Sequence, residues 1–182
     1  MEKVHTGNYK NCTVGNTVSI SGDAGKEADY KGLTLTTLAP KKEFWQKWKE
    51  NLGKISTEES NLYYIREYYD KVLRHLDPNE IMNKLPEDPI LLCYEDSNEF
   101  CHRHLVAFWF ELFLGIQTSE VKINPKRETL TRLERPEYLK KMMEDVIREN
   151  YEMHNHNSIR AAYLYNQSEE AEKAYILENN WL

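Results

Sequence analysis

Short apolar runs alternate with amphipathic stretches along the first two thirds of the chain. Alternating or continuous apolar positions predict strands at residues 3–6, 17–21, 90–92 and 120–124, with a further strand or extended segment at 33–38. Apolar positions that recur every three or four residues predict a helix over 42–52, a long one over 62–76 and a short one after Asp77-Pro78. This alternation predicts an α/β fold, a largely parallel sheet flanked by helices on both of its faces.

The strand at 90–92 and the helix that follows it are the most apolar part of the chain. Residues 105–113 are apolar almost all round, which predicts a helix buried in the fold. Asn98 is the predicted N-cap of this helix, with Glu99 in its first turn. Cys93 then ends a central strand, while residues 101–103 open the helix. Because ligands of open α/β sheets bind outside the carboxyl ends of the strands, and helix N-termini attract anions, this junction is the predicted site.

The residue types at this junction suit catalysis. Cys93 is a candidate nucleophile, because the helix dipole and His102 would lower the pKa of its thiol. His102 or Glu95 is the candidate acid–base group. Arg103 is predicted to hold an anion of the ligand, with Cys101 beside it. The spacing from Cys93 to Arg103 is ten positions, which differs from the cysteine, five residues, arginine pattern of phosphatase loops.

Each of these residues also has a purely structural interpretation. Free cysteine is among the most buried residue types, so Cys93 and Cys101 are also candidates for core packing. Arg103 could instead form an intramolecular salt bridge with Glu95 or Glu99. The tryptophans of the helix over 42–52 lie on its apolar stripe with Phe44, which favours core packing over base stacking.

A metal site is a third hypothesis, built on Cys93, Cys101 and His102, with Cys12 or His5 as further ligands. Structural zinc sites have short paired spacings such as Cys-x2-Cys, and Cys-x7-Cys-His is not one of them. We therefore predict no metal and no cofactor. His154 and His156 lie in a polar segment without converging partners, so they are expected to be solvated.

The last third of the chain has a different pattern. Residues 125–182 are predicted to form a helical extension of an α/β domain at 1–124. Pro136 suits the first position of a helix whose apolar face comprises Leu139, Met142, Met143, Val146 and Ile147. After a polar break at 151–157, residues 161–182 resume a helical pattern. This extension is expected to cover the sheet domain or to bind a partner protein.

Composition narrows the classes of partner. The net charge of −6 is spread along the chain, so no basic patch indicates nucleic-acid binding. No apolar run approaches the ~20 residues that span a bilayer, and the N-terminus lacks the apolar core of an export signal. Three cysteines without framework spacing are typical of a reducing cytoplasm, which is the predicted location.

The segment Leu91-Leu-Cys-Tyr-Glu95 followed by Phe100-Cys-His-Arg103 resembles the bacterial and phage family catalogued as domain of unknown function 488. Thr6-Gly-Asn-Tyr9, Ser19-Ile-Ser21 and Leu38-Ala-Pro40 are similar to further features of that family. The likeness covers roughly residues 3–124. It implies an α/β fold and a site that includes Thr6, Asn8, Tyr9 and Ser21 as ligand-binding residues, but no particular reaction. After Ser21 many members have Arg and Pro where this chain has Gly22-Asp23-Ala24, so the likeness assigns no anion site to that loop.

Together these features predict an enzyme that acts on a phosphate-bearing or nucleotide-like small molecule through the Cys/His/Arg junction. The alternative is a binding module that holds a nucleotide, a nucleic-acid end or a protein in the same crevice without chemistry.

Overall fold

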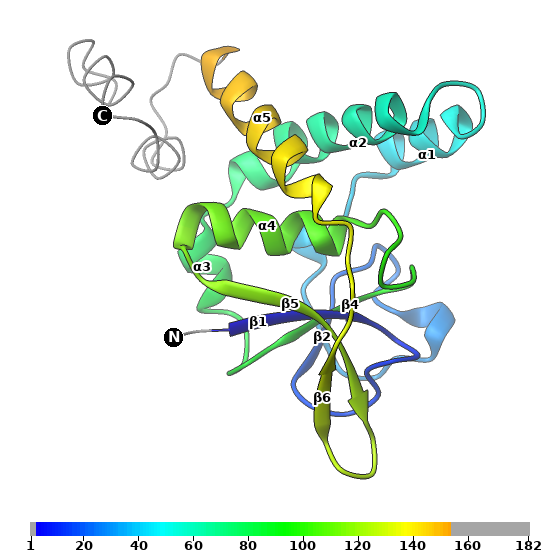
Figure 1. Ribbon diagram of the computed structural model, residues 1–182, viewed down its shortest axis with the longest axis vertical. Coiled ribbons are helices and arrows are strands. Elements are labelled where there is room, and N and C mark those ends of the chain that lie inside the picture. The colour runs from blue at the N-terminus through cyan, green and yellow to red at the C-terminus, as the bar shows by residue number, and fades with distance from the viewer. Residues whose placement is uncertain (1–2, 154–182) are drawn as a thin grey trace, which may run out of the picture.

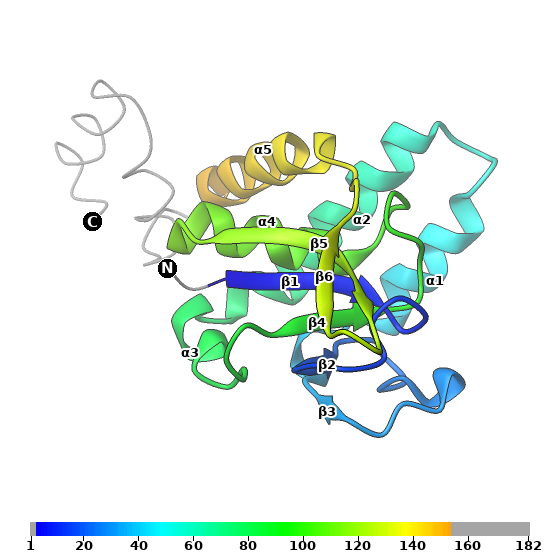
Figure 2. The ribbon, with the colours of Figure 1, turned by 60° about the horizontal axis from the view of Figure 1, so that its bottom comes forward.

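The computed structural model describes residues 3–153, in which a six-stranded sheet lies under a stack of helices (Figures 1 and 2). The sheet order is β3-β2-β4-β1-β5-β6, and all neighbours are parallel except β5 and β6. The predicted α/β class with a largely parallel sheet is confirmed. The strands are β1 (Lys3–Asn8), β2 (Thr17–Ser19), β3 (Leu33–Thr34), β4 (Ile90–Cys93), β5 (Gln117–Asn124) and β6 (Thr129–Arg132).

Two strands differ from the sequence prediction. The segment at 33–38 gives only the two residues of β3 and then a 3₁₀ helix, Thr36–Leu38. The strand predicted at 120–124 begins earlier, at Gln117, and turns back through the antiparallel β6. All four residues of β6 are exposed, so it has no apolar alternation by which the sequence could indicate it.

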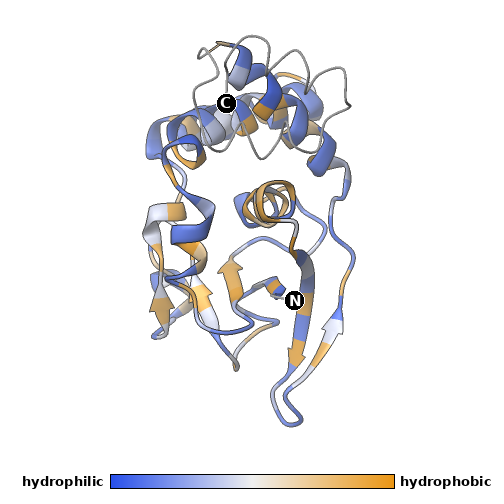
Figure 3. Cartoon of the chain, turned by 90° about the vertical axis from the view of Figure 1, so that its left-hand side faces the viewer, coloured by the Kyte–Doolittle hydropathy of each residue, from blue (hydrophilic) through white to orange (hydrophobic). Residues whose placement is uncertain are grey.

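The helices form two layers above one face of the sheet. The helices are α1 (Lys42–Asn51), α2 (Thr57–Lys71), α3 (Pro78–Met82), α4 (His102–Leu114) and α5 (Tyr138–Met153), with 3₁₀ turns at Lys26–Ala28 and Leu73–His75. α4 lies on the strands, and α5 and α2 lie above it (Figure 3). The first nine residues of α4 are all buried, as its apolar pattern predicted. Within residues 3–153 no helix is long and apolar enough to cross a membrane.

The opposite face of the sheet carries no α-helix in the described part of the chain, so the prediction of helices on both faces is wrong. A small apolar cluster of Cys12, Ile90, Leu92, Val121 and Ile123 lies there, covered by Tyr9, Val14 and Tyr30 from the loops after β1 and β2. This face lacks an α-helix because the connection from β1 to β2 runs only through residues 9–16, which is too short for a helical crossover.

α5 belongs to the main hydrophobic core. Leu139, Met143, Val146 and Ile147 are buried, with Met142 packed beside them, as the sequence predicted. The helix begins at Tyr138 instead of Pro136 and packs against α2 and α4. The predicted boundary after Asn124 falls within the β5–β6 hairpin. His154, His156 and the helical pattern of 161–182 lie outside the described residues. The solvation of the two histidines and the binding of a partner by the helical segment therefore stay predictions.

α2 begins with a capping box, which gives a test of local structure. The Ser56 hydroxyl accepts a hydrogen bond from the Glu59 backbone N–H, and the Glu59 carboxylate accepts one from the Ser56 N–H. Ser56→Ala is expected to lower the free energy of unfolding by about 1 kcal/mol, roughly 2–4 °C in melting temperature. Thr57→Ala, an exposed control one residue on, should change little, and equal effects of the two would contradict a role for the cap.

Candidate functional site

The carboxyl ends of β1, β2 and β4 meet at one edge of the sheet, and a pocket of about 430 Å³ opens there. Four chemically reactive side chains lie in its wall. Cys93 is the last residue of β4, Glu95 follows two positions later, and Cys101 and His102 begin α4. We call these four residues the Cys/His/Glu cluster. The sequence predicted their meeting, because parallel strands place their carboxyl ends, and the helices that follow them, on one side.

The cluster is tightly packed. The Nδ1 atom of His102 lies 3.8 Å from the sulfur of Cys93 and 3.8 Å from the sulfur of Cys101. The Cys101 sulfur is 2.9 Å from Oε2 of Glu95, close enough to require one proton between them. Both cysteines and His102 are almost completely buried, whereas about a third of the Glu95 side chain is exposed. Glu95 is therefore the most accessible member of the cluster.

The hydrogen bond at the other ring nitrogen decides which nitrogen of the neutral His102 ring carries the hydrogen. Nε2 lies 2.8 Å from the carbonyl oxygen of Ile20, which follows β2. Because a carbonyl oxygen only accepts, Nε2 must carry the hydrogen and donate it. In the neutral imidazole, Nδ1 then holds a free lone pair, and it is the atom that faces both sulfurs.

α4 starts later than the sequence predicted. Asn98 is not its N-cap and Glu99 is not in its first turn, because Cys101 occupies the cap position without a side-chain cap bond. The Glu99 carboxylate instead accepts the backbone N–H of Asp96, within the turn between β4 and α4. The delayed start places Cys101 and His102 directly at the amino end of the helix.

Burial and mutual contact shift the pKa values within the cluster. Burial, with the negative charge of Cys101, raises the pKa of Glu95 to about 7. The hydrogen bond with Cys101, together with burial, holds the pKa of Cys93 well above its ordinary range. Burial also opposes ionisation of Cys101, but the hydrogen bond with Cys93 and the charges of Arg103 and His102 outweigh it and hold its pKa well below that range. Within this pair the pKa of Cys93 is thus raised and that of Cys101 is lowered.

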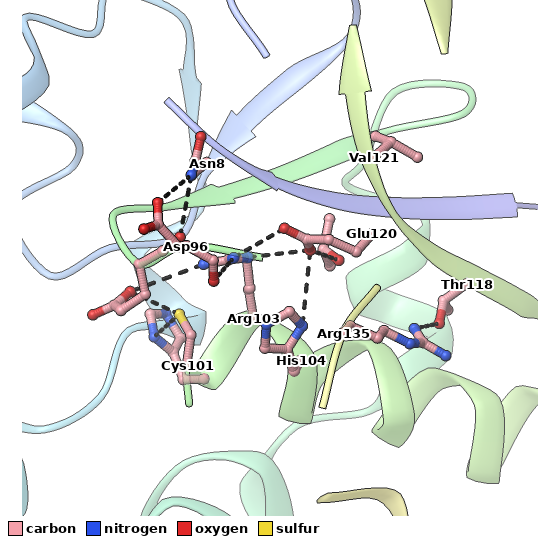
Figure 4. A network of polar contacts seen from close by, with 12 residues as sticks. Asn8, Asp96, Cys101, Arg103, His104, Thr118, Glu120, Val121 and Arg135 are labelled. Carbon is pink, nitrogen blue, oxygen red and sulfur yellow. Dashed lines mark hydrogen bonds and ion pairs between the residues drawn. The ribbon is translucent and has the colours of Figure 1, made fainter. Parts of the chain in front are cut away.

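Arg103 faces away from the pocket and into the core (Figure 4). Its guanidinium donates to both carboxylate oxygens of Glu120 on β5, at 2.9 and 3.3 Å, and to the backbone oxygen of Asp96 at 2.9 Å. Arg103 is therefore part of a buried ion pair, as its structural interpretation predicted. Its main partner is Glu120, whereas the sequence analysis predicted Glu95 or Glu99. Glu95 Oε2 is 4.0 Å from its Nη1, and the side chains of Arg103 and Glu120 are both fully buried. The predicted anion-binding role has no support in this arrangement.

The residues implied by the family resemblance lie near the pocket, but only Ser21 lines it. The Thr6 hydroxyl donates to Glu120, 2.5 Å away. The Asn8 amide donates to the backbone oxygen of Glu95 at 3.4 Å, which helps to hold the turn after β4. The Tyr9 hydroxyl bonds the hydroxyls of Ser19 and Ser21. Asn8 and Tyr9 thus support segments around the pocket without facing it, whereas Thr6 supports Glu120 on β5.

Aromatic side chains that the sequence analysis did not assign to the site complete the pocket wall. Trp48 from α1, Tyr64 from α2 and Phe100 line the pocket and pack on one another, with ring centroids 5.0–5.5 Å apart. Trp45 also lines it, so core packing accounts fully only for Phe44, which is buried. No sequence signal could have shown this, because α1 reaches the sheet edge only through the tertiary fold.

One group of side chains in the described part of the chain is arranged as metal ligands are. One donor atom each from Cys93, Cys101 and His102 lies within 4.8 Å of the others. The further ligands considered from sequence are elsewhere. Cys12 donates to the backbone oxygen of Val121 on the other face of the sheet, and His5 bonds Ser119.

No family model, curated protein or solved structure matches this chain. The resemblance of residues 3–124 to domain of unknown function 488 therefore stays a prediction. Functional inference depends on the geometry of the pocket alone.

Proposed function

We propose that the protein is an enzyme whose reaction centre is the Cys/His/Glu cluster and whose substrate occupies the adjoining pocket. One observation carries the proposal: two thiols, an imidazole whose Nδ1 faces both sulfurs and a partly exposed carboxylate line one cavity of about 430 Å³, together with aromatic side chains that include Trp48, Tyr64 and Phe100. Titratable groups that converge in a cleft of this size are typical of catalytic sites. Glu95 is the acid–base group of the proposal, because it is the most accessible member of the cluster.

The aromatic wall of the pocket, formed by Trp48, Tyr64 and Phe100, favours a substrate with a flat ring. Stacking on aromatic side chains contributes about 1–3 kcal/mol per nucleic-acid base and tolerates different bases. A nucleobase or a similar heterocycle fits such a wall.

The charges around the pocket favour an uncharged ligand over the phosphate-bearing one predicted from sequence. Asp23, Glu27 and Glu95 line the pocket, with Lys42 as the one lysine or arginine among the described lining residues. The guanidinium of Arg103 is occupied by Glu120. A nucleobase or nucleoside therefore suits this wall better than a nucleotide does.

The reduced state of the thiols suits the cytoplasm that the sequence predicts. Cys12, Cys93 and Cys101 are all free. A reducing compartment keeps Cys93 and Cys101 available to the proposed reaction centre.

Thermal-shift screening with analysis of products tests the proposal. Nucleobases, nucleosides and the matching nucleotides are incubated with the protein, and melting temperature and product masses are recorded. A ligand at 100 times its dissociation constant adds about 2.7 kcal/mol, which raises the melting temperature by roughly 5–10 °C. We expect this shift and a new product with an unphosphorylated compound. Stabilisation without turnover supports the binding-module alternative and counts against the enzyme, and no shift with any compound removes the ligand class.

Trp48→Ala tests where the ligand binds. The variant is expected to weaken binding of the selected compound by about 1–3 kcal/mol, or roughly 5- to 150-fold. Leu130→Ala is the matched control, since Leu130 is an exposed apolar residue on β6 and does not line the pocket. Equal affinities of Trp48→Ala and the control would place the ligand elsewhere.

A further inference from the structure

The donor atoms of Cys93, Cys101 and His102 lie within 4.8 Å of one another, close to the spacing of ligands around one tetrahedral metal ion. With Zn–S distances of about 2.3 Å and Zn–N distances of about 2.0–2.1 Å, two ligands of a tetrahedron lie about 3.5–3.8 Å apart. His102 Nδ1 is 3.8 Å from the sulfur of Cys93 and 3.8 Å from that of Cys101. We propose that Cys93, Cys101 and Nδ1 of His102 bind a zinc ion in the wall of the pocket.

The surroundings of His102 are those of a metal ligand. Zinc-bound histidines usually donate their second N–H to a carbonyl or a carboxylate, which fixes the ring and directs the other lone pair at the metal. His102 does this through Nε2 to Ile20. The other ring nitrogen, Nδ1, faces the sulfurs of Cys93 and Cys101.

Charge balance agrees with this assignment. A buried pair of thiolates is costly without a compensating cation, and zinc binding deprotonates coordinating thiols. Two thiolates and a neutral imidazole neutralise one divalent ion. The softness of the ligands also favours zinc, because thiolate and imidazole ligands select zinc over magnesium or calcium.

The site is of the open kind, which leaves one position for water or substrate. Structural zinc sites have four protein ligands, whereas catalytic ones have three. Glu95 is not assigned as a fourth ligand, because its 2.9 Å contact with the Cys101 sulfur is a hydrogen-bond distance and shorter than two tetrahedral ligands approach. Glu95 would lie beside a bound ion, and zinc would lower the pKa of a water in the open position towards neutrality.

The zinc site rests on the proposed function, because both use the same pocket. Metal content is measured without any substrate, so the zinc site and the enzymatic activity can be rejected independently. Protein made without a histidine tag is analysed by mass spectrometry of the metals, and we expect one zinc per chain. Cobalt substitution should give the visible bands of tetrahedral Co²⁺ and thiolate-to-cobalt charge transfer. Zinc well below one per chain, before and after incubation with zinc salts under reducing conditions, would overturn the proposal.

Variants identify the ligands. Loss of an outer-shell partner weakens metal binding about 10- to 100-fold, so loss of a ligand in Cys93→Ser or Cys101→Ser should exceed about 100-fold. Cys12→Ser is the matched control, because that buried thiol lies on the other face of the sheet and should retain one zinc. Should the variants fail to fold, wild-type protein stripped by a chelator is titrated with zinc, which should protect Cys93 and Cys101 from alkylation. A Cys93–Cys101 disulfide that persists in the presence of zinc would also reject the site.

Discussion

Glu120→Gln is expected to lower the free energy of unfolding by about 3–5 kcal/mol, because it leaves the charge of Arg103 buried without its counterion. Both side chains are fully buried, and Glu120 also accepts the hydroxyl of Thr6. When one partner of a buried ion pair is removed, the free energy of desolvating the remaining charge is no longer offset by their attraction. Urea denaturation followed by tryptophan fluorescence measures the effect.

An exposed ion pair in the same protein provides the control. Arg66 and Glu149 join α2 to α5 through two hydrogen bonds of 2.9 Å, but about half of each side chain is exposed. Glu149→Gln should therefore cost no more than about 1 kcal/mol. Similar losses in the two variants would show that the buried pair is not what stabilises the strand–helix junction.

A double substitution distinguishes the contribution of the ion pair itself from the cost of the unpaired charge that a single substitution leaves buried. Arg103→Met with Glu120→Leu removes both charges at once, and replacement of a buried ion pair by apolar residues is often neutral or stabilising. The double variant is expected to be more stable than Glu120→Gln alone. If it is less stable, shape and packing at this position matter more than charge.

The sequence predicted where the site lies better than what each residue does there. A buried strand followed by an apolar helix is a local pattern, so the meeting of Cys93 with His102 could be read from it. The partner of Arg103 could not, because Glu120 lies on β5 and reaches it only through the pairing of β5 beside β1. The alternation along β5 places Glu120 on the face opposite Val121 and Ile123, with Lys122, and does not show that Glu120 is buried beside a cation.

Residues of the aromatic wall were missed for a related reason. The periodicity of α1 places Phe44, Trp45 and Trp48 on one side of the helix but does not show what that side covers. Only the packing of α1 against α2 brings Trp48 to Tyr64, at the edge of the sheet. The short paired spacing of structural zinc sites also could not indicate the meeting of Cys93, Cys101 and His102, because these residues come from the end of a strand and the start of a helix, separated by a turn.

Glu95→Gln is expected to reduce turnover of the substrate found by screening about 10²- to 10⁴-fold, while zinc content and ligand affinity stay near those of the wild type. Glutamine keeps the shape of the side chain and its place in the pocket wall, but it cannot take up a proton from a bound water. Turnover, zinc per chain and the ligand-induced shift in melting temperature are measured on the same preparation.

The control is another carboxylate of the same pocket. Glu27 lines the cavity but lies in the loop after β2, on the 3₁₀ turn at Lys26–Ala28 and outside the Cys/His/Glu cluster, so Glu27→Gln should keep turnover within a few-fold of the wild type. If Glu95→Gln loses the zinc, Glu95 is a ligand and the open coordination position is wrong. If it keeps full turnover with the metal in place, the proton is taken by another group and the acid–base assignment fails. A large loss confined to turnover is the one pattern that a carboxylate beside a metal-bound water requires, because binding and coordination do not depend on its proton.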